Sequence, residues 1–385
     1  MDGSRVKLSS LTFAVIALVM GLVIMRADAE LVTGRVVSIG FPATTPNGAV
    51  IRLGRWFPIR VQLAIQGTGT VTRTIKFESI DLDGDRVAII RPEVTVTTEG
   101  GAGVRDIWCY GLVNALGEEF PQALVLLDEN GAAAERLPRP TVDWLPNDDL
   151  LVVDVSDMAV VGLMRLMTPA WSPRSRMEGT RDFYRNVVVS KLAAADLPDR
   201  WIGLECADVV VWDQPSASDL KRIGPMDALL QWVDHGGQLI DGAGGARAAL
   251  PGRTPGAPPP LAGDGVVAEL NDLPLFRQRF LIGNAGASPL ERVTLTTVAD
   301  LAPDAIRTLG ELGGPRGSIN MVAMRSSGAG RIVASAASLR DLTPSPAREE
   351  AFFAGLMELN TFSEAEKTQQ AAAGQQYLGA NYVYD

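Results

Sequence analysis

Residues 150–155 read Leu-Leu-Val-Val-Asp-Val, and two later stretches, 186–189 (Asn-Val-Val-Val) and 207–212 (Ala-Asp-Val-Val-Val-Trp), have the same character. Short, continuous apolar runs rich in β-branched residues are typical of parallel strands that are covered on both faces. A further run, 331–336 (Arg-Ile-Val-Ala-Ser-Ala), comes much later in the chain. These stretches predict buried strands in the C-terminal half of the protein.

A helical pattern separates two of these predicted strands. From Ser218 to His235, apolar residues recur three and four positions apart, and Gly236-Gly237 ends the pattern. A strand over residues 238–241 is predicted to follow. Because strands that alternate with helices indicate a doubly wound sheet, we predict a flavodoxin-like α/β domain over residues 148–360.

Residues 31–137 have a different texture. Residues 59–65 (Ile-Arg-Val-Gln-Leu-Ala-Ile) alternate apolar with polar or small side chains, and similar stretches follow, separated by turns rich in Gly and Asp. Alternation of this kind, with no helical stretch between, predicts an all-β domain, an immunoglobulin-like antiparallel sandwich. Prolines make residues 138–147 a predicted linker. Residues 361–385 are predicted to be a polar tail, and their aromatic end favours a natural chain that continues further.

The first 29 residues have the pattern of a signal peptide. Basic residues precede an uncharged apolar run at 11–25, and Ala27-Asp28-Ala29 matches the small-x-small motif that signal peptidase reads. An apolar run of this length rises only about 22 Å as a helix, less than a hydrocarbon core of about 30 Å. The sequence therefore predicts cleavage before Glu30 and a periplasmic or other extracytoplasmic location, with an uncleaved membrane anchor as the alternative.

The composition excludes several classes of partner and site. A formal charge of −10 argues against nucleic acid and anionic lipid. The single histidine, His235, excludes a multi-histidine metal site, and no cofactor is expected. Cys109 and Cys206 fall in different predicted domains and are expected to be isolated buried thiols. The acidic turn at 81–85 does not fit a calcium loop, because Pro92 occupies the position of the bidentate Glu.

Two motifs carry a family resemblance. Residues 231–240 (Gln-Trp-Val-Asp-His-Gly-Gly-Gln-Leu-Ile) and 328–333 (Gly-Ala-Gly-Arg-Ile-Val) resemble segments of the class I glutamine amidotransferase-like fold. The closer similarity is to the non-catalytic branch of that family in large bacterial envelope proteins. In those proteins a β-sandwich often precedes the domain and membrane spans often follow it. The resemblance covers roughly residues 150–345 and implies little about the ligand.

The positions that the family uses for catalysis are changed in this sequence. Active members place a Cys on a sharp turn after a strand, where it attacks the amide of glutamine. The matching turn here, residues 241–245, reads Asp-Gly-Ala-Gly-Gly, and residues 331–342 contain neither His nor Glu. His235 precedes the turn instead. The resemblance thus implies a pseudoenzyme that lacks the catalytic triad.

Aspartates at or just after the predicted strand ends form a candidate ligand site. Because the carboxyl edge of a doubly wound sheet is where such folds bind ligands, they could share one rim with the glycine turn. The residues are Asp154, Asp157, Asp213, Asp241, Gly242, Ala243 and Gly244. They could bind a cation or sugar hydroxyls, or they could simply cap turns.

Together these features predict a non-enzymatic scaffold or binding protein of the cell envelope, whose partners are other envelope or membrane proteins. One alternative is a hydrolase that acts on envelope glycans through two carboxylates. Another is a carbohydrate-binding module with exposed coplanar aromatic side chains on the predicted sandwich.

Overall fold

The structure is a computed structural model, and it describes part of the chain. The described residues are 31–66, 69–80, 83, 85–98, 102–114, 124–138, 141–147, 149–156, 187–213, 223–242, 261–262, 266–269, 292–295, 300–301, 307–314, 317–335, 338–339, 353 and 356–357. The predicted signal peptide and C-terminal tail lie outside them. No helix within these ranges is long and apolar enough to cross a membrane.

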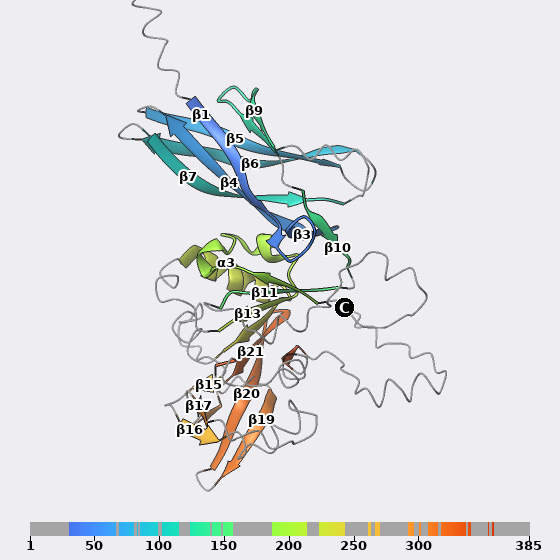
Figure 1. Cartoon of the computed structure of the whole chain (residues 1–385), viewed down its shortest axis with the longest axis vertical. Helices are drawn as coiled ribbons and strands as arrows, with labels where there is room; N and C mark the ends of the chain where they lie inside the picture. The colour runs from blue at the N-terminus through green and yellow to red at the C-terminus, as the bar shows by residue number, and fades with distance from the viewer. Residues whose placement is uncertain are drawn as a thin grey trace, which may run out of the picture. The chain divides into compact units, whose positions relative to one another are not determined.

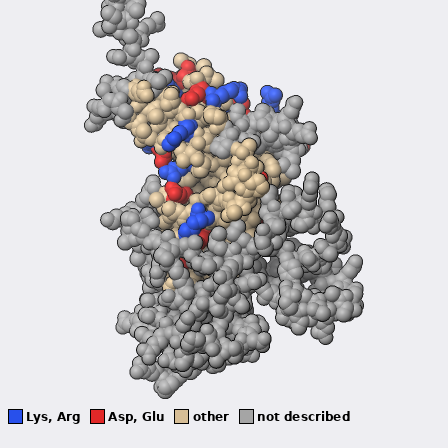
Figure 2. Space-filling model, viewed as in Figure 1, with Lys and Arg blue, Asp and Glu red and all other residues tan. Residues whose placement is uncertain are grey.

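The chain divides into two compact units. Unit 1 consists of residues up to Ser38 together with Ile59–Gly111 and Leu116–Pro140, and unit 2 consists of Ile39–Pro58, Leu112–Ala115 and Thr141–Asp385. On the face shown in Figure 2, basic and acidic side chains are interspersed over the described surface. The net negative charge is therefore not gathered into one acidic patch on the described part of that face.

Unit 1 is built from two sheets (Figure 1). The first has the strand order β1-β4-β7 and the second has the order β6-β5-β8-β9. Their bounds are β1 Leu31–Ile39, β4 Trp56–Gln66, β5 Gly69–Ile80, β6 Arg86–Thr98, β7 Ala102–Leu112, β8 Leu124–Leu127 and β9 Ala133–Leu137. In the second sheet all three strand pairs are antiparallel.

Alternating side chains form the core of unit 1. Val61 and Leu63 of β4 are fully buried, while Arg60, Gln62 and Ala64, which alternate with them, are partly exposed. This alternation is expected for a strand with one covered face. A Cβ atom on Gly34 of β1 would lie 2.7 Å from Leu126 Cδ1 of β8. The first sheet therefore packs directly against the second at this glycine, and a larger residue would require Leu126 and Leu137 to shift.

Unit 2 is centred on a seven-stranded sheet with the order β12-β11-β13-β14-β21-β20-β19. The strands are β11 Leu150–Asp154, β12 Val187–Lys191, β13 Val209–Trp212, β14 Gln238–Asp241, β19 Arg307–Gly314, β20 Gly317–Ser327 and β21 Gly330–Ser335. The first five strands in that order run parallel, and β20 and β19 add an antiparallel ribbon. The strands β11, β13 and β14 are buried along their whole length, which explains the unbroken apolar runs Leu150–Val153 in β11 and Val209–Trp212 in β13.

Smaller elements complete unit 2. The helix α3 (Ile223–Asp234) buries Leu229 and Val233, and two 3₁₀ turns, η1 (Ala194–Asp196) and η2 (Trp201–Leu204), connect β12 to β13. A three-stranded sheet joins β10 (Asp143–Leu145), β3 (Ala49–Arg52) and β2 (Phe41–Pro42) in that order. Two small antiparallel pairs consist of β15 (Leu261–Ala262) with β18 (Asp300–Leu301) and β16 (Val266–Glu269) with β17 (Arg292–Leu295).

The predicted fold class is wrong. We expected an immunoglobulin-like sandwich followed by a doubly wound, flavodoxin-like α/β domain, but the described chain is mostly β, in several sheets. α3 is the one α-helix whose bounds the described residues give, and Phe353 and Leu356 are the other described residues in α-helical conformation. A doubly wound fold needs helices on both faces of its sheet. Valine-rich runs identify buried strands but do not reveal what connects them. The antiparallel ribbon β19-β20, which we did not predict, adds further strand content.

Candidate functional site

Three of the predicted site aspartates come together at the carboxyl edge of the sheet in unit 2. Asp154 ends β11, Asp241 ends β14, and Asp213 directly follows β13 between them. The register pairs Asp154 with Val211 and Trp212 with Asp241, so the three strands end almost level. Of the remaining predicted residues, the structure describes Gly242. Asp157, Ala243 and Gly244 lie outside the described residues.

Asp154 is buried and paired with a lysine. Its Oδ2 lies 3.5 Å from Nζ of Lys191, and its Oδ1 accepts a hydrogen bond of 3.0 Å from the backbone N–H of Ser156. The Lys191 ammonium also donates to the carbonyl oxygen of Ser156. Because Lys191 stands opposite Asp154 in the β11-β12 register, the pair neutralises a charge that would otherwise be costly to bury.

Asp213 is also fully buried, and it ties a distant segment to the sheet. Its Oδ2 accepts from the hydroxyl of Ser338 at 2.9 Å, and its Oδ1 accepts from the backbone N–H of Leu339 at 3.3 Å. Its own backbone N–H donates to Oγ of Ser156 at 3.1 Å. These hydrogen bonds hold the buried Asp213 side chain in one position, as is typical of a residue with a structural role.

Gly242 packs against this carboxylate. A Cβ atom at position 242 would lie 1.9 Å from Oδ1 of Asp213, so no residue larger than glycine fits without displacing the aspartate. The backbone N–H of Gly242 donates to the carbonyl of Trp212 at 2.9 Å. The first glycine of the turn is therefore required by close packing, and its position cannot carry a nucleophilic side chain.

Sequence reasoning missed the partners of these aspartates. Lys191, Ser156 and Ser338 bind these aspartates or their backbone. Of the three, Lys191, two residues after the predicted strand 186–189, was the one that a charge pattern at the strand end could have indicated. Two buried atoms of the same strands, Ser190 Oγ and Trp212 Nε1, have no hydrogen-bond partner in the part of the chain that the structure describes. No metal-binding group of acidic, Cys or His side chains occurs among the described residues.

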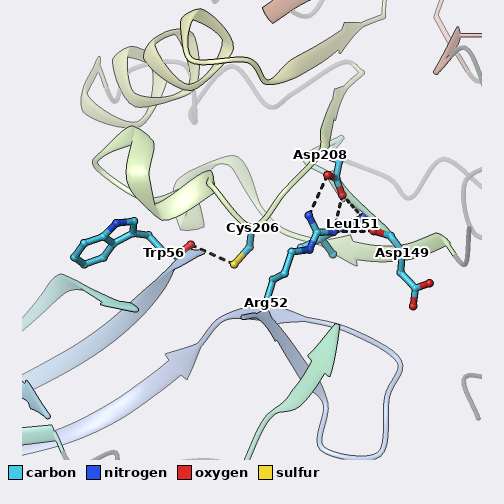
Figure 3. Close-up of polar contacts among 6 residues, drawn as sticks. All are labelled: Arg52, Trp56, Asp149, Leu151, Cys206 and Asp208. Atoms are coloured by element: carbon cyan, nitrogen blue, oxygen red, sulfur yellow. Dashed lines mark hydrogen bonds and ion pairs between the residues drawn. The ribbon is translucent and has the colours of Figure 1, made fainter. Parts of the chain in front are cut away.

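A second polar cluster lies where β11 and β13 begin (Figure 3). The guanidinium of Arg52, from β3, donates to both carboxylate oxygens of Asp208 at 2.7 and 3.0 Å and to the carbonyl oxygen of Asp149 at 2.8 Å. Asp208 also accepts a 2.8 Å bond from the N–H of Leu151. Burial alone would lower the pKa of Arg52, but the hydrogen bonds and charge of Asp208 outweigh it and raise that pKa. The arrangement is a clamp that fixes β3 to the sheet.

Cys206 is adjacent to this clamp and is sealed from solvent. Its Sγ donates to the carbonyl oxygen of Trp56 at 3.2 Å, as Figure 3 shows, and burial raises the pKa of the thiol to about 12. The thiolate is the reactive form of cysteine, and a thiol with this pKa is protonated at neutral pH. Cys206 therefore cannot serve as a nucleophile in this state.

We predict that Cys206 resists alkylation by iodoacetamide at pH 8 in the folded protein and reacts after unfolding in urea. Because its folded pKa lies above its unfolded value of 9.0, the folded state holds the proton more tightly. Stability should thus fall as pH rises from about 9 toward 12, and Cys206→Ala should remove that part of the pH dependence. Rapid labelling of the native protein at Cys206, measured by mass spectrometry, would refute the assignment.

His235 has a separate environment at the end of α3. Its ring stacks on Trp201 with centroids 4.0 Å apart and planes 7° from parallel, and its Nδ1 lies 2.7 Å from the carbonyl oxygen of Gln231. The side chain is exposed. These contacts indicate a structural role for His235, which follows the last residue of α3 and stacks on Trp201.

The two glycine motifs pack against each other. A Cβ on Gly330 would lie 2.0 Å from the carbonyl oxygen of Val233 and 2.3 Å from that of Gly237, and Gly328 (φ +58°) approaches Asp234 equally closely. The N–H of Ala329 donates to the carbonyl of Asp234 at 2.9 Å. The turn between β20 and β21 thus caps the C-terminal end of α3, so these glycines have a packing role.

Comparison with known proteins gives no family. No protein-family model matches the chain. The large subunit of exodeoxyribonuclease 7 from Sinorhizobium medicae (strain WSM419) is 28% identical over 124 residues, which cover 26% of this chain and 22% of that protein. The chain thus matches less than a quarter of this relative's length.

Several solved structures of glycoside hydrolases have limited similarity. The β-galactosidase from Rahnella sp. R3 has a TM-score of 0.26 and 19% identity, covering 45% of this chain and 25% of that enzyme. The exo-β-1,4-mannosidase Op5Man5 from Opitutaceae bacterium strain TAV5 has a TM-score of 0.29 and 13% identity, with 55% and 36% coverage. The β-galactosidase from Bacillus circulans sp. alkalophilus has a TM-score of 0.28 and 12% identity, with 55% and 31% coverage. Similarities this low carry no argument about activity.

Proposed function

We propose that this protein is a non-enzymatic, extracytoplasmic binding protein of the cell envelope that acts through contact with other envelope or membrane proteins. The observation that carries the proposal is the state of the carboxylates at the carboxyl edge. Asp154 is paired with Lys191, Asp213 holds Ser338 and Leu339, and both aspartates are 0% exposed. General acid–base catalysis requires a group within hydrogen-bond reach of the substrate, and these carboxylates are committed to the protein itself.

The thiol and the turn support the same proposal. Cys206 is buried with a pKa of about 12, and Gly242 has no room for a side chain beside Asp213. His235 stacks on Trp201 at the end of α3 rather than on either of these groups. Nucleophile activation needs a base in contact with the nucleophile, and the described contacts of these residues do not supply that pairing.

The glycan hydrolase alternative is not favoured by this geometry. Such an enzyme needs two carboxyl groups about 5–10 Å apart that both reach the substrate. Asp154, Asp213 and Asp241 are at most 5% exposed. The carbohydrate-binding alternative requires coplanar aromatic side chains. The partly exposed aromatic residues described on β1, β4 and β7 are Trp56 and Trp108, which belong to different units.

The test is an assay of the purified protein with glutamine, aryl esters and aryl glycosides. No turnover above that of the heat-denatured protein is expected. Turnover that disappears in a folded Asp213→Asn or Asp154→Asn variant would contradict the proposal, because it would assign a reactive carboxylate to the edge. Export is tested in the native host by mass spectrometry of the extracytoplasmic fraction, where Glu30 should be the first residue; a protein found only in the cytoplasm would contradict it.

A further inference from the structure

The outer surface of the first sheet in unit 1 differs from ordinary solvated surface. We define the β1-β4-β7 face by the side chains that point away from the core, which alternate with inward residues such as Val61 and Ile107. The exposed or partly exposed ones described in unit 1 are Thr33, Arg35, Val37, Arg60, Gln62, Ala64, Gln66, Val104, Asp106 and Trp108. Figure 1 shows the three strands side by side, with β4 between the other two.

A preorganised polar network holds the middle of this face. Arg60 lies 2.6 Å from Asp106 Oδ2, and Gln62 donates to the other oxygen of Asp106 at 2.9 Å. The guanidinium carbon of Arg60 is also 5.9 Å from the centre of the Trp108 ring, within range of a cation–π contact. The hydrogen bonds from Arg60 and Gln62 and the nearby charge of Arg35 lower the pKa of Asp106. The network therefore stabilises the charged form of Asp106.

Exposed apolar side chains flank the network. Val37 on β1 is 43% exposed and Val104 on β7 is 65% exposed. Arginine and tryptophan are enriched in protein–protein interfaces and dominate their binding energy, whereas lysine, glutamate and aspartate are depleted there. Arg60 and Trp108, on the same face as two exposed valines, have the enriched composition, and the one carboxylate of the network, Asp106, is paired with Arg60.

The outer face of the second sheet provides an internal comparison. Its described side chains include a Thr72–Thr95 contact of 3.3 Å and a Lys76–Glu78 pair of 2.8 Å. Ile90, 57% exposed and opposite Lys76 in the register, is its one large apolar side chain of high exposure among the described residues. The described strands of this second sheet contain no tryptophan, and one large apolar side chain is exposed on them where the β1-β4-β7 face has two, so the two faces of unit 1 are not equivalent.

We propose that the β1-β4-β7 face docks a folded protein through an acidic patch of that partner. The inference rests on the proposed binding function and names the surface that performs it. Arg35 and Arg60 outnumber Asp106, so the face has a local excess of positive charge on a chain with a formal charge of −10. A second copy would present the same excess of positive charge, which opposes face-to-face docking of two copies. The guanidinium over Trp108 obstructs stacking of a sugar on that side of the ring.

The experiment begins with photocrosslinking in the native host. The photoreactive residue p-benzoylphenylalanine is placed at position 104 of the full chain, with position 90 as the matched exposed control on the other face. A protein adduct from position 104 that is absent from position 90 is expected. No adduct at 104, an adduct with lipid or glycan, or an adduct with a second copy of this chain would overturn the proposal.

Affinity measurements complete the test, with purified variants of this protein and the purified partner that crosslinking identifies. Arg35→Glu and Trp108→Ala should each weaken binding by at least about tenfold, and raising the salt concentration should weaken it further. Arg136→Glu, a charge reversal at a 69% exposed arginine of β9, is the matched control and should stay within about twofold. Equal weakening by Arg136→Glu and Arg35→Glu would overturn the proposed surface. Hydrolytic turnover without loss of this binding would overturn the proposed function alone.

Discussion

Arg52→Ala should lower the free energy of unfolding by about 3 kcal/mol, the low end of the range for breaking a buried ion pair. The Arg52 side chain is 5% exposed, and its removal leaves Asp208 without its bidentate partner. The low end applies because the Asp208 side chain keeps 33% exposure, so water can partly solvate the remaining carboxylate. The carbonyl of Asp149 loses a donor as well. Urea denaturation followed by tryptophan fluorescence measures the change.

Arg55→Ala is the matched control for this variant. Arg55 is 53% exposed and pairs with Glu205 at 3.3 Å, and Glu205 keeps the N–H of Trp56 as a second donor. An exposed pair of this kind contributes less than about 1 kcal/mol. Equal losses from the two variants would contradict the view that the buried clamp, rather than positive charge in general, holds β3 to the sheet.

Gly330→Ala should also cost about 3 kcal/mol, because the added methyl group meets backbone rather than a side chain that can rotate away. Its Cβ would approach the carbonyl oxygens of Val233 and Gly237 to 2.0 and 2.3 Å. The turn before β21 must then move away from the end of α3, with loss of the hydrogen bond from Ala329 to Asp234. Thermal unfolding monitored by circular dichroism should show a correspondingly lower midpoint.

Gly48→Ala separates crowding from backbone strain. Gly48 has a φ of +74° but nothing within 4 Å of an added Cβ, so only the left-handed conformation opposes the substitution, by about 1 kcal/mol. If Gly330→Ala proved as mild as Gly48→Ala, the close packing of the two glycine motifs would be disproved.

Local composition predicted the buried strands well. Residues 150–155 correspond to β11 (Leu150–Asp154), residues 207–212 to β13 (Val209–Trp212), and residues 331–336 to β21 (Gly330–Ser335). Burial on both faces favours apolar side chains at successive positions, as in β11 and β13, so such strands are recognisable in the sequence as continuous apolar runs. The level ends of β11, β13 and β14 follow from the parallel pairing, and this brings Asp154, Asp213 and Asp241 to one edge.

Contacts between residues far apart in the sequence, and the connections between strands, produced no recognisable local pattern. Arg52 and Asp208 are 156 residues apart, and Asp213 and Ser338 are 125 apart, so neither contact is visible in a local pattern. The doubly wound prediction failed because it extended a helical pattern, residues 218–235, to the connections of a whole sheet. That pattern corresponds to α3 (Ile223–Asp234), but the described chain is mostly β. The ribbon of β19 and β20 is rich in glycine and serine, residues that are depleted in or neutral to strands, and local propensity gave no reason to expect it.

Carboxyl footprinting tests the central claim, that the carboxylates at the edge of the sheet are sealed within the protein. The folded protein is treated with a water-soluble carbodiimide and an amine, and modification at each aspartate is followed by mass spectrometry. Asp106, whose side chain is 38% exposed, provides the reference rate. We expect Asp154 and Asp213 to remain unmodified while Asp106 reacts. Modification of Asp154 or Asp213 at the rate of Asp106 would show that the edge is open to solvent and would contradict the proposed burial of these carboxylates.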